Sequence, residues 1–273
     1  MSNSNAGPGI QGLLADYLLR NDLRDSTAEF YCRVVNVFCK WLGCDVPVSD
    51  LDARLLSEFL RAKQTAGLSS YYRRSLRSGL VAILGKMIDS RDVRSVKLTP
   101  LDHQSWTAAD VGKLIAAVDC LPEKKREPLR LLIQVAYYTG LAEIDLRRLT
   151  KSHIDAAGTV RIRRSKTGEE SVTRIPIDLL KRLPGGSGPF FPLATSGEMF
   201  RRDFRRVVAA AGLTGTFKTL RRSSGTAAEL LTGKGHEHLA NSRKIFERHY
   251  LDRRHVERKP TELPPPELGG KAG

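Results

Sequence analysis

Apolar residues recur every three to four positions through the first third of the chain, in four separate runs. This spacing places the apolar side chains of each run on one face of a helix. The predicted stripes are Leu13, Leu14, Tyr17 and Leu18; then Phe30, Val34, Val35, Phe38, Trp41 and Leu42; then Leu51, Leu55, Leu56, Phe59 and Leu60; and finally Leu76, Leu80, Val81, Leu84, Met87 and Ile88.

Residues that favour helix N-termini precede three of these runs. The cap candidates are Asp25, Ser26 or Thr27 for the second helix, Asp50 for the third, and Ser69 or Ser70 for the fourth. Short amphipathic helices bury their apolar stripes by packing against one another. We therefore expect a small helical bundle over residues 10–95.

A second unit is predicted over residues 107–255, after a polar linker at residues 96–106. Thr107 is a cap candidate before the run AADVGKLIAAV, and a helix from about Arg126 to Tyr138 breaks at Gly140. Further helical runs are predicted around Ile144, Leu146 and Leu149, from Ser196 onward, from Thr219 to Leu231 and from Ser242 to Tyr250.

The apolar period changes between Thr159 and Ile177. Two short β-like runs surround Lys166, Thr167 and Gly168, which predicts an antiparallel hairpin. The expected fold class is therefore mostly α with a small antiparallel β-sheet. Residues 1–9 are predicted to be a flexible tail, and residues 256–273 a Pro/Gly-rich, disordered one.

The charge of the chain is strongly positive and uneven. Its 45 Lys and Arg against 30 Asp and Glu give a net charge of +15. Residues 1–100 contribute +4 (14 basic minus 10 acidic) and residues 101–273 contribute +11 (31 minus 20). An excess of this size indicates a polyanionic partner, most simply nucleic acid.

The composition narrows the class of protein further. A hydrophobic fraction of 41% excludes a wholly disordered chain, and no run approaches the roughly 18 consecutive apolar residues of a membrane span. The first residues, MSNSNAGPG, lack the apolar segment of a secretory signal. The four cysteines form no CxxC pair, so we expect buried free thiols and no metal. We expect a soluble, cytoplasmic, nucleoid-associated protein.

Four local features lie in order in the second unit. They are the stretch Tyr138–Leu141 followed by Asp145, Lys166 at the hairpin tip, the helix start Lys218–Arg222, and the stretch Phe246–Asp252. With these features the sequence resembles the tyrosine recombinase (phage integrase) family over residues 10–255. The resemblance implies a helical core-binding, SAM-like domain at residues 10–95 and a catalytic domain at residues 107–255.

The resemblance implies roles for individual residues. Tyr250 would be the nucleophile that forms a 3′-phosphotyrosyl bond with DNA. Arg221 would stabilise the charge on the phosphate, and Lys166 would protonate the leaving 5′ oxygen. Lys218 matches a position that is usually His in the family, and would bind the phosphate or move the tyrosine proton. Asn241, nine residues before Tyr250 (250−241), matches the third phosphate-binding position.

Asp145 would orient neighbouring groups, and Asn241 has a second interpretation as the cap of the last helix. The family's partners would be double-stranded DNA, held between two domains in a C-shaped clamp, and three further copies of the chain in a homo-tetramer on paired sites. The chemistry needs no cofactor and no metal in the family.

The family's first catalytic arginine is missing here. Its position is Ala142, whereas Asp145, three residues on, matches the pattern. Arg147 and Arg148 lie five and six residues on, where a helix directs them away from the Ala142 face. Losing one preorganised donor typically costs about 10²–10³ in rate.

Basic and aromatic side chains supply candidate contacts to the DNA backbone. The alternative for each is an ordinary solvated surface residue. The candidates are Tyr72, Arg73, Arg74, Arg77, Arg163, Arg164, Arg201, Arg205 and Arg222.

The sequence leaves three functions open. The first is a site-specific recombinase or integrase, whose catalysis is impaired by the missing arginine. The second is a non-catalytic DNA-binding relative that acts as partner or regulator of an active recombinase. The third is a basic RNA-associated scaffold, although no RNA-reading aromatic motif is present.

Overall fold

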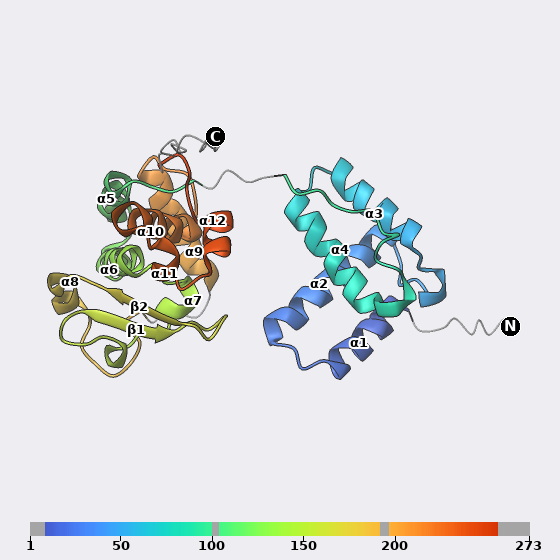
Figure 1. Ribbon diagram of the computed structural model, residues 1–273, viewed down its shortest axis with the longest axis horizontal. Coiled ribbons are helices and arrows are strands. Elements are labelled where there is room, and N and C mark those ends of the chain that lie inside the picture. Colours follow the sequence, from blue (N-terminus) through green and yellow to red (C-terminus); the bar gives the residue numbers. More distant parts are fainter. Residues whose placement is uncertain (1–8, 100–103, 192–196, 256–273) are drawn as a thin grey trace, which may run out of the picture. The chain divides into compact units, whose positions relative to one another are not determined.

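The computed structural model describes residues 9–99, 104–191 and 197–255. The chain divides into two compact units between residues 101 and 102, inside the predicted linker. Figure 1 shows each unit with its own set of packed helices. The predicted tails and the expected helix start at Ser196 lie outside the described residues.

The regular secondary structure of the first unit is helical over its described residues. Its four α-helices are α1 (Ile10–Arg20), α2 (Asp25–Leu42), α3 (Ala53–Thr65) and α4 (Ser70–Leu84), with short 3-10 turns at Val48–Asp50 and Gly85–Met87. The apolar stripes face one core, in which the rings of Phe38 and Phe59 meet edge to face with centroids 5.0 Å apart. The prediction for Met87 is wrong, because it lies beyond the end of α4 and is exposed. A Cβ on Gly79 of α4 would lie 3.0 Å from Val34 of α2, so this glycine allows the two helices to pack closely.

Helix starts in this unit were predicted with mixed success. Ser69 caps α4 by accepting a hydrogen bond from Tyr72 N, as expected. The prediction that Asp50 caps α3 is wrong, because Asp50 ends a 3-10 turn and Asp52 accepts from Leu55 N instead. Helix α2 begins after Arg24 without a side-chain cap, so none of Asp25, Ser26 and Thr27 acts as one.

The second unit combines helices with one hairpin. Its elements are α5 (Ala108–Ala116), α6 (Glu123–Thr139), α7 (Glu143–Leu146), β1 (Thr159–Arg163), β2 (Glu170–Arg174), α8 (Ile177–Arg182), α9 (Gly197–Ala210), α10 (Phe217–Thr232), α11 (Gly235–His238) and α12 (Arg243–His249), with 3-10 turns at Ala117–Cys120 and Lys151–His153. Helix α10 packs against α6 and α11, and β2 lies beside α6 and α11. This arrangement brings the hairpin to the helices that carry the candidate site (Figure 1).

The predicted hairpin and the cap at Thr107 are confirmed. Strands β1 and β2 pair antiparallel with Arg163 opposite Glu170, so Lys166 lies in the connecting turn. Thr107 forms a reciprocal capping box with Asp110. The short helices α8 and α11 were not predicted, and α7 ends at Leu146 rather than extending to Leu149.

Two further properties concern the described residues as a whole. The cysteines are free thiols; Cys39 is buried and Cys44 is exposed, so the expectation that all are buried is wrong. No helix within the described ranges is both long enough and apolar enough to span a bilayer.

Candidate active site

Arg221 is the buried centre of the candidate site. It lies one turn into α10, and only 5% of it is exposed. Its guanidinium group donates from Nη1 to the Gly140 carbonyl and from Nη2 to the Leu239 carbonyl, the latter at 2.9 Å. Arg221 therefore joins three segments: α10, the end of α6 and the loop after α11.

The break after α6 has a steric reason. Gly140 has φ +60°, which places it in the left-handed region, and a Cβ there would lie 2.4 Å from Leu239. Only glycine fits this close approach without displacing the Leu239 side chain. The helix break predicted at Thr139 and Gly140 thus lies at the carbonyl group that accepts a hydrogen bond from Arg221.

Arg164 is the second buried arginine of the site. It follows β1 directly and is 7% exposed. Its Nη1 donates to the carbonyls of Leu239 (3.2 Å) and Ala240 (2.6 Å) and to Asn241 Oδ1 (3.1 Å). Its burial separates it from Arg163, the exposed neighbour in the same basic run.

Tyr250 lies against these cations. It is half-buried at the end of α12, whose N-terminus is capped by Ser242 rather than by Asn241. The Arg221 Cζ is 5.1 Å from the ring centroid of Tyr250, and the Lys218 Nζ is 5.8 Å from it. Burial by itself raises the pKa of Tyr250, but the charges of Arg221, Lys218 and Arg164 outweigh it and the net shift is downward.

Lys218 and Lys166 supply two ammonium groups. Lys218 is exposed as a residue, yet its surroundings desolvate the ammonium group and lower its pKa, and Lys166 lowers it further. The hairpin turn thus brings Lys166 within electrostatic range of Lys218. The structure thus brings Tyr250, Arg221 and Lys218 together, and their catalytic roles remain a prediction.

Several buried donors around residues 239–241 have no acceptor among the described residues. They are Nε of Arg164, Nε of Arg221 and Nδ2 of Asn241. Buried polar groups are nearly always paired in folded proteins. A cluster of unpaired cationic donors is the chemistry of a site for an anion such as a phosphate.

Asp145 positions the hairpin turn. It is 2% exposed, and its Oδ1 accepts hydrogen bonds from both N and Oγ of Ser165 at 2.8 Å. Ser165 lies between Arg164 and Lys166 in the chain. Asp145 therefore orients two cations of the site through the residue between them.

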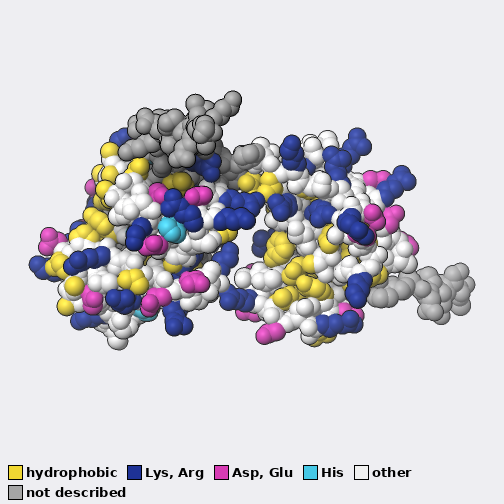
Figure 2. All heavy atoms as spheres, in the orientation of Figure 1, with side chains coloured by type: hydrophobic (Ala, Val, Ile, Leu, Met, Phe, Trp, Pro, Cys, Tyr) yellow, Lys and Arg dark blue, Asp and Glu magenta, His cyan; other side chains and the backbone are white. Residues whose placement is uncertain are grey.

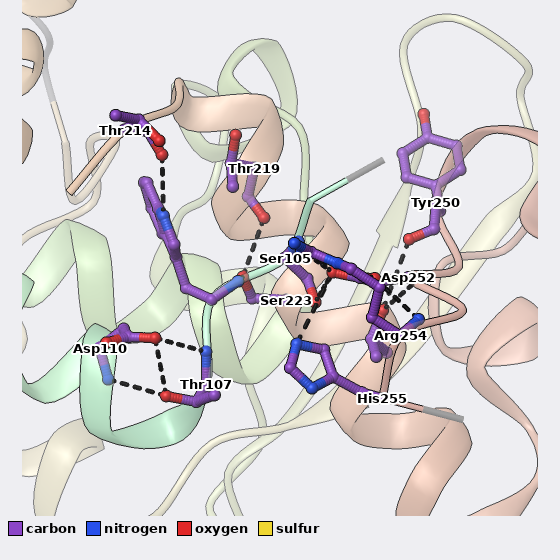
Figure 3. A network of polar contacts seen from close by, with 12 residues as sticks. Ser105, Thr107, Asp110, Thr214, Thr219, Ser223, Tyr250, Asp252, Arg254 and His255 are labelled. Carbon is purple, nitrogen blue, oxygen red and sulfur yellow. Dashed lines mark hydrogen bonds and ion pairs between the residues drawn. The ribbon is translucent and has the colours of Figure 1, made fainter. Parts of the chain in front are cut away.

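Asp252 anchors the segment that carries Tyr250, and it was missed in the sequence. Its Oδ2 accepts from N (2.6 Å) and Oγ (3.0 Å) of Ser105, and its own N donates to Thr226 Oγ1. Arg254 pairs with the same carboxylate. Figure 3 shows the ring of Tyr250 pointing away from this network while its carbonyl lies beside it.

The electrostatics of Asp252 agree with this anchoring. Burial by itself raises the pKa of Asp252, but hydrogen bonds from Arg254 and Ser105 outweigh it and hold the pKa well below its usual range. On the other side, Arg222 Nε donates to the His249 carbonyl at 3.1 Å. The backbone of Tyr250 is thus held from both flanks.

No family model and no curated protein sequence matches this chain. Among solved structures, a lambda integrase dimer bound to a COC' core site is similar with a TM-score of 0.75 and 20% identity, covering 96% of this chain and 82% of that one. The Tn1549 transposon integrase in complex with circular intermediate DNA has a TM-score of 0.66 at 14% identity, covering 89% and 95%. The XerH site-specific recombinase bound to a palindromic difH substrate has a TM-score of 0.65 at 17% identity, covering 88% of this chain and 80% of that one.

The chain has the fold of the tyrosine recombinases. The predicted fold class is therefore confirmed: a mostly helical chain with a small antiparallel sheet. In this tyrosine recombinase fold, Ala142 is the half-buried residue immediately before α7 and has no polar side chain to offer. Arg147 pairs with Glu143, whereas Arg148 donates to Ser165 and lies 4.0 Å from Asp145.

The candidate DNA contacts in the first unit differ in how their side chains are engaged. Tyr72 and Arg74 are exposed. Arg73 donates to the Leu68 carbonyl and to Gln64, and Arg77 donates to the carbonyls of Ser90, Val93 and Arg94. Arg77 thus fastens the segment after α4, and DNA contact by all four residues remains a prediction.

The candidates on the surface of the second unit are exposed. Arg163 extends from β1, and Arg201 and Arg205 lie on α9, where Arg201 Nε is 3.5 Å from Glu143. Figure 2 shows Lys and Arg side chains spread over the drawn face of each unit, with acidic side chains among them. Contact between these arginines and DNA also remains a prediction.

Proposed function

We propose that this protein cuts and rejoins double-stranded DNA at specific sites through a 3′-phosphotyrosyl intermediate on Tyr250. The observation that carries the proposal is the contact of the Tyr250 ring with Arg221 and Lys218, beside buried donors that lack an acceptor. The fold adds support, since similar solved structures include integrases and a recombinase bound to DNA.

In the first step, Tyr250 Oη attacks the phosphorus and the bond from phosphorus to the 5′ oxygen breaks. The phenol proton is lost to solvent, which the lowered pKa of Tyr250 favours, while the Lys218 ammonium group stabilises the phenolate oxygen. Lys166 gives a proton to the departing 5′ oxygen. A 5′ hydroxyl from another strand reverses these transfers and restores the phosphodiester without an external energy source.

The cations stabilise the charge that develops during this attack. The phosphorus becomes five-coordinate, and negative charge gathers on its non-bridging oxygens. Arg221 is preorganised for these oxygens because two carbonyl contacts fix its guanidinium group before substrate arrives. The lowered pKa of Tyr250 has the same origin, since an environment that favours tyrosinate also favours a phosphate anion.

The assembly that performs strand exchange would be a homo-tetramer on two DNA sites. One similar solved structure is a lambda integrase tetramer bound to a Holliday junction, with a TM-score of 0.75 and 21% identity. Sedimentation of the protein with a synthetic four-way junction measures this directly. Four protomers per junction support the proposal, and a single bound copy at saturation contradicts it.

The main test traps covalent protein–DNA adducts. The protein is incubated with sheared total DNA from its source, denatured in SDS, and the DNA that stays attached is counted and sequenced. Adducts that vanish in Tyr250→Phe establish the nucleophile, and clustering of the trapped sequences establishes site specificity. Adducts that persist in Tyr250→Phe would assign the attack to another residue.

The second candidate function is a non-catalytic DNA-binding protein that acts with an active recombinase. Ala142 favours it, because the position that holds an arginine in the family offers no donor here. Absence of adducts together with tight, salt-sensitive binding to duplex DNA would support this function. Stronger binding to RNA hairpins than to duplex DNA would instead favour an RNA scaffold.

A further inference from the structure

We propose that Arg164 supplies the guanidinium group that is absent at position 142, so that two arginines, Arg164 and Arg221, hold the phosphate beside Tyr250. This inference rests on the proposed function, which it extends by one catalytic residue. The replacement comes from the end of β1 rather than from the start of α7.

The two guanidinium groups are immediate neighbours. Arg164 Nη1 lies 3.2 Å from the Leu239 carbonyl oxygen, and Arg221 Nη2 lies 2.9 Å from the same atom. Arg221 also contacts the carbonyl of Gly140, two residues before Ala142. The guanidinium group of Arg164 therefore lies next to that of Arg221, which itself contacts the chain two residues before position 142.

Two adjacent buried cations are unfavourable on their own. Burial and the charge of Arg164 lower the pKa of Arg221, and together they outweigh Tyr250 and Asp145, which raise it. The buried carboxylate nearby, Asp145, uses Oδ1 to accept two hydrogen bonds from Ser165. An anion placed between the guanidinium groups removes their repulsion and turns the arrangement into a binding site.

Arg164 has donors left for such an anion. Its three hydrogen bonds all come from Nη1, and Nε is buried without an acceptor among the described residues. A merely structural clamp on residues 239–241 would leave no reason to bury Nε unpaired. The donor edge of Arg164, like that of Arg221, therefore suits two oxygens of one phosphate.

The test measures binding of inorganic phosphate to the full chain by ³¹P NMR titration, so it needs no knowledge of the DNA site. Arg164→Gln is expected to weaken phosphate binding about tenfold or more, because it removes a charged donor pair. The matched control is Arg174→Gln, an exposed arginine of β2 on the same hairpin, which is expected to leave the affinity unchanged. An equal loss in both variants, or no phosphate binding by the wild-type protein, overturns the inference.

A rescue variant separates a catalytic from a structural role. Arg164→Gln combined with Ala142→Arg is expected to regain most of the lost phosphate affinity, which a broken structural clamp would not do. If Arg164→Gln does not fold, Arg164→Lys keeps the buried charge but lacks Nε, and is expected to lie between wild type and Gln. Wild-type affinity in Arg164→Lys would contradict the role of Nε.

The two proposals can fail separately. Absence of Tyr250 adducts on DNA, with phosphate binding that depends on Arg164, refutes strand cleavage and retains the anion site. Adducts that depend on Tyr250 and are formed equally well by a folded Arg164→Gln variant refute the role of Arg164 and retain strand cleavage.

Discussion

The two units use arginine side chains on backbone carbonyls in different ways. Arg77 in the first unit donates to three carbonyls after α4 while staying partly exposed. Arg164 and Arg221 in the second unit make similar contacts but are buried, adjacent and left with unpaired Nε atoms. Arg77 keeps access to solvent, which hydrates a cation at little cost. The buried pair lacks that access, and the proposed phosphate would balance its charge.

The largest effect is expected at Arg221, where a substitution should impair the reaction with DNA, whereas one at Arg77 should mainly impair stability. Arg221→Gln should lower the yield of covalent DNA adducts by about 10²–10³, because it removes a preorganised cation at the phosphate. Arg77→Gln should mainly lower the free energy of unfolding, by about 1–3 kcal/mol. Quantified adduct gels at saturating DNA and urea unfolding curves measure the two effects. Similar adduct losses in both variants would erase the distinction between the units.

Restoring an arginine at position 142 tests the cations of the second unit by a gain of activity rather than by a loss. Ala142→Arg should raise the rate of adduct formation by about 10–10², part of the 10²–10³ that one donor contributes. The measurement is single-turnover cleavage of a trapped site, with circular dichroism as the folding control. No gain in a folded variant that still binds DNA would mean either that position 142 does not face the phosphate or that Arg164 already fills its role, and the same substitution in Arg164→Gln separates the two.

The anchor of Tyr250 gives a prediction with a pH signature. Asp252→Asn should lower the free energy of unfolding by about 1.5–3 kcal/mol at neutral pH, since it weakens hydrogen bonds to a buried charge. The pKa of Asp252 is depressed in the folded state, so its contribution is complete above the unfolded value of about 3.9. It is lost as the pH falls below about 4 toward the folded pKa.

Unfolding curves between pH 3 and pH 7 test this prediction. The difference between wild type and Asp252→Asn should be constant from about pH 5 upward and shrink at lower pH. Asp16, an exposed carboxylate 3.7 Å from Arg20, provides the control variant Asp16→Asn. A difference that grows toward acid pH would contradict the depressed pKa.

The smallest effect concerns the backbone beside Asn241. Ala240 has φ +47°, the single described non-glycine residue in the left-handed region. Ala240→Gly should stabilise the protein by about 1 kcal/mol, because glycine adopts this conformation without strain. Ala116→Gly, in helix α5, should instead destabilise by about 1 kcal/mol. Equal effects of the two substitutions in thermal unfolding would show that Ala240 is unstrained.

The sequence was sufficient for the elements whose signals are local. The four helical stripes, the Ser69 and Thr107 caps and the hairpin at Lys166 were predicted because each depends on spacing within a few residues. Helices α8 and α11, of 6 and 4 residues, are too short to produce a periodic pattern. Asp50 was chosen over Asp52 because composition alone does not distinguish a 3-10 turn from a helix start.

The sequence named residues that the structure brings together, but it did not predict which of them are buried or what they contact. Arg221, Lys218 and Tyr250 come together as the family resemblance implied. Val160, Ile162 and Arg164 are buried at every second position, as expected for one face of a strand. The sequence analysis missed this because it treated the whole basic run as surface residues. Asp252 reaches Ser105 across 147 residues of sequence, a distance over which no local pattern carries information.

That long separation has a consequence for synthesis on the ribosome. The strand, turn and helices that carry Arg164, Lys166, Lys218 and Arg221 are translated before the segment that closes onto Ser105. Contacts between distant parts of a chain form only after the intervening residues exist. A nascent chain therefore assembles its cations first and seats Tyr250 last. Chains that end before residue 252 therefore lack the hydrogen bonds from Ser105 to Asp252 that hold the Tyr250 segment.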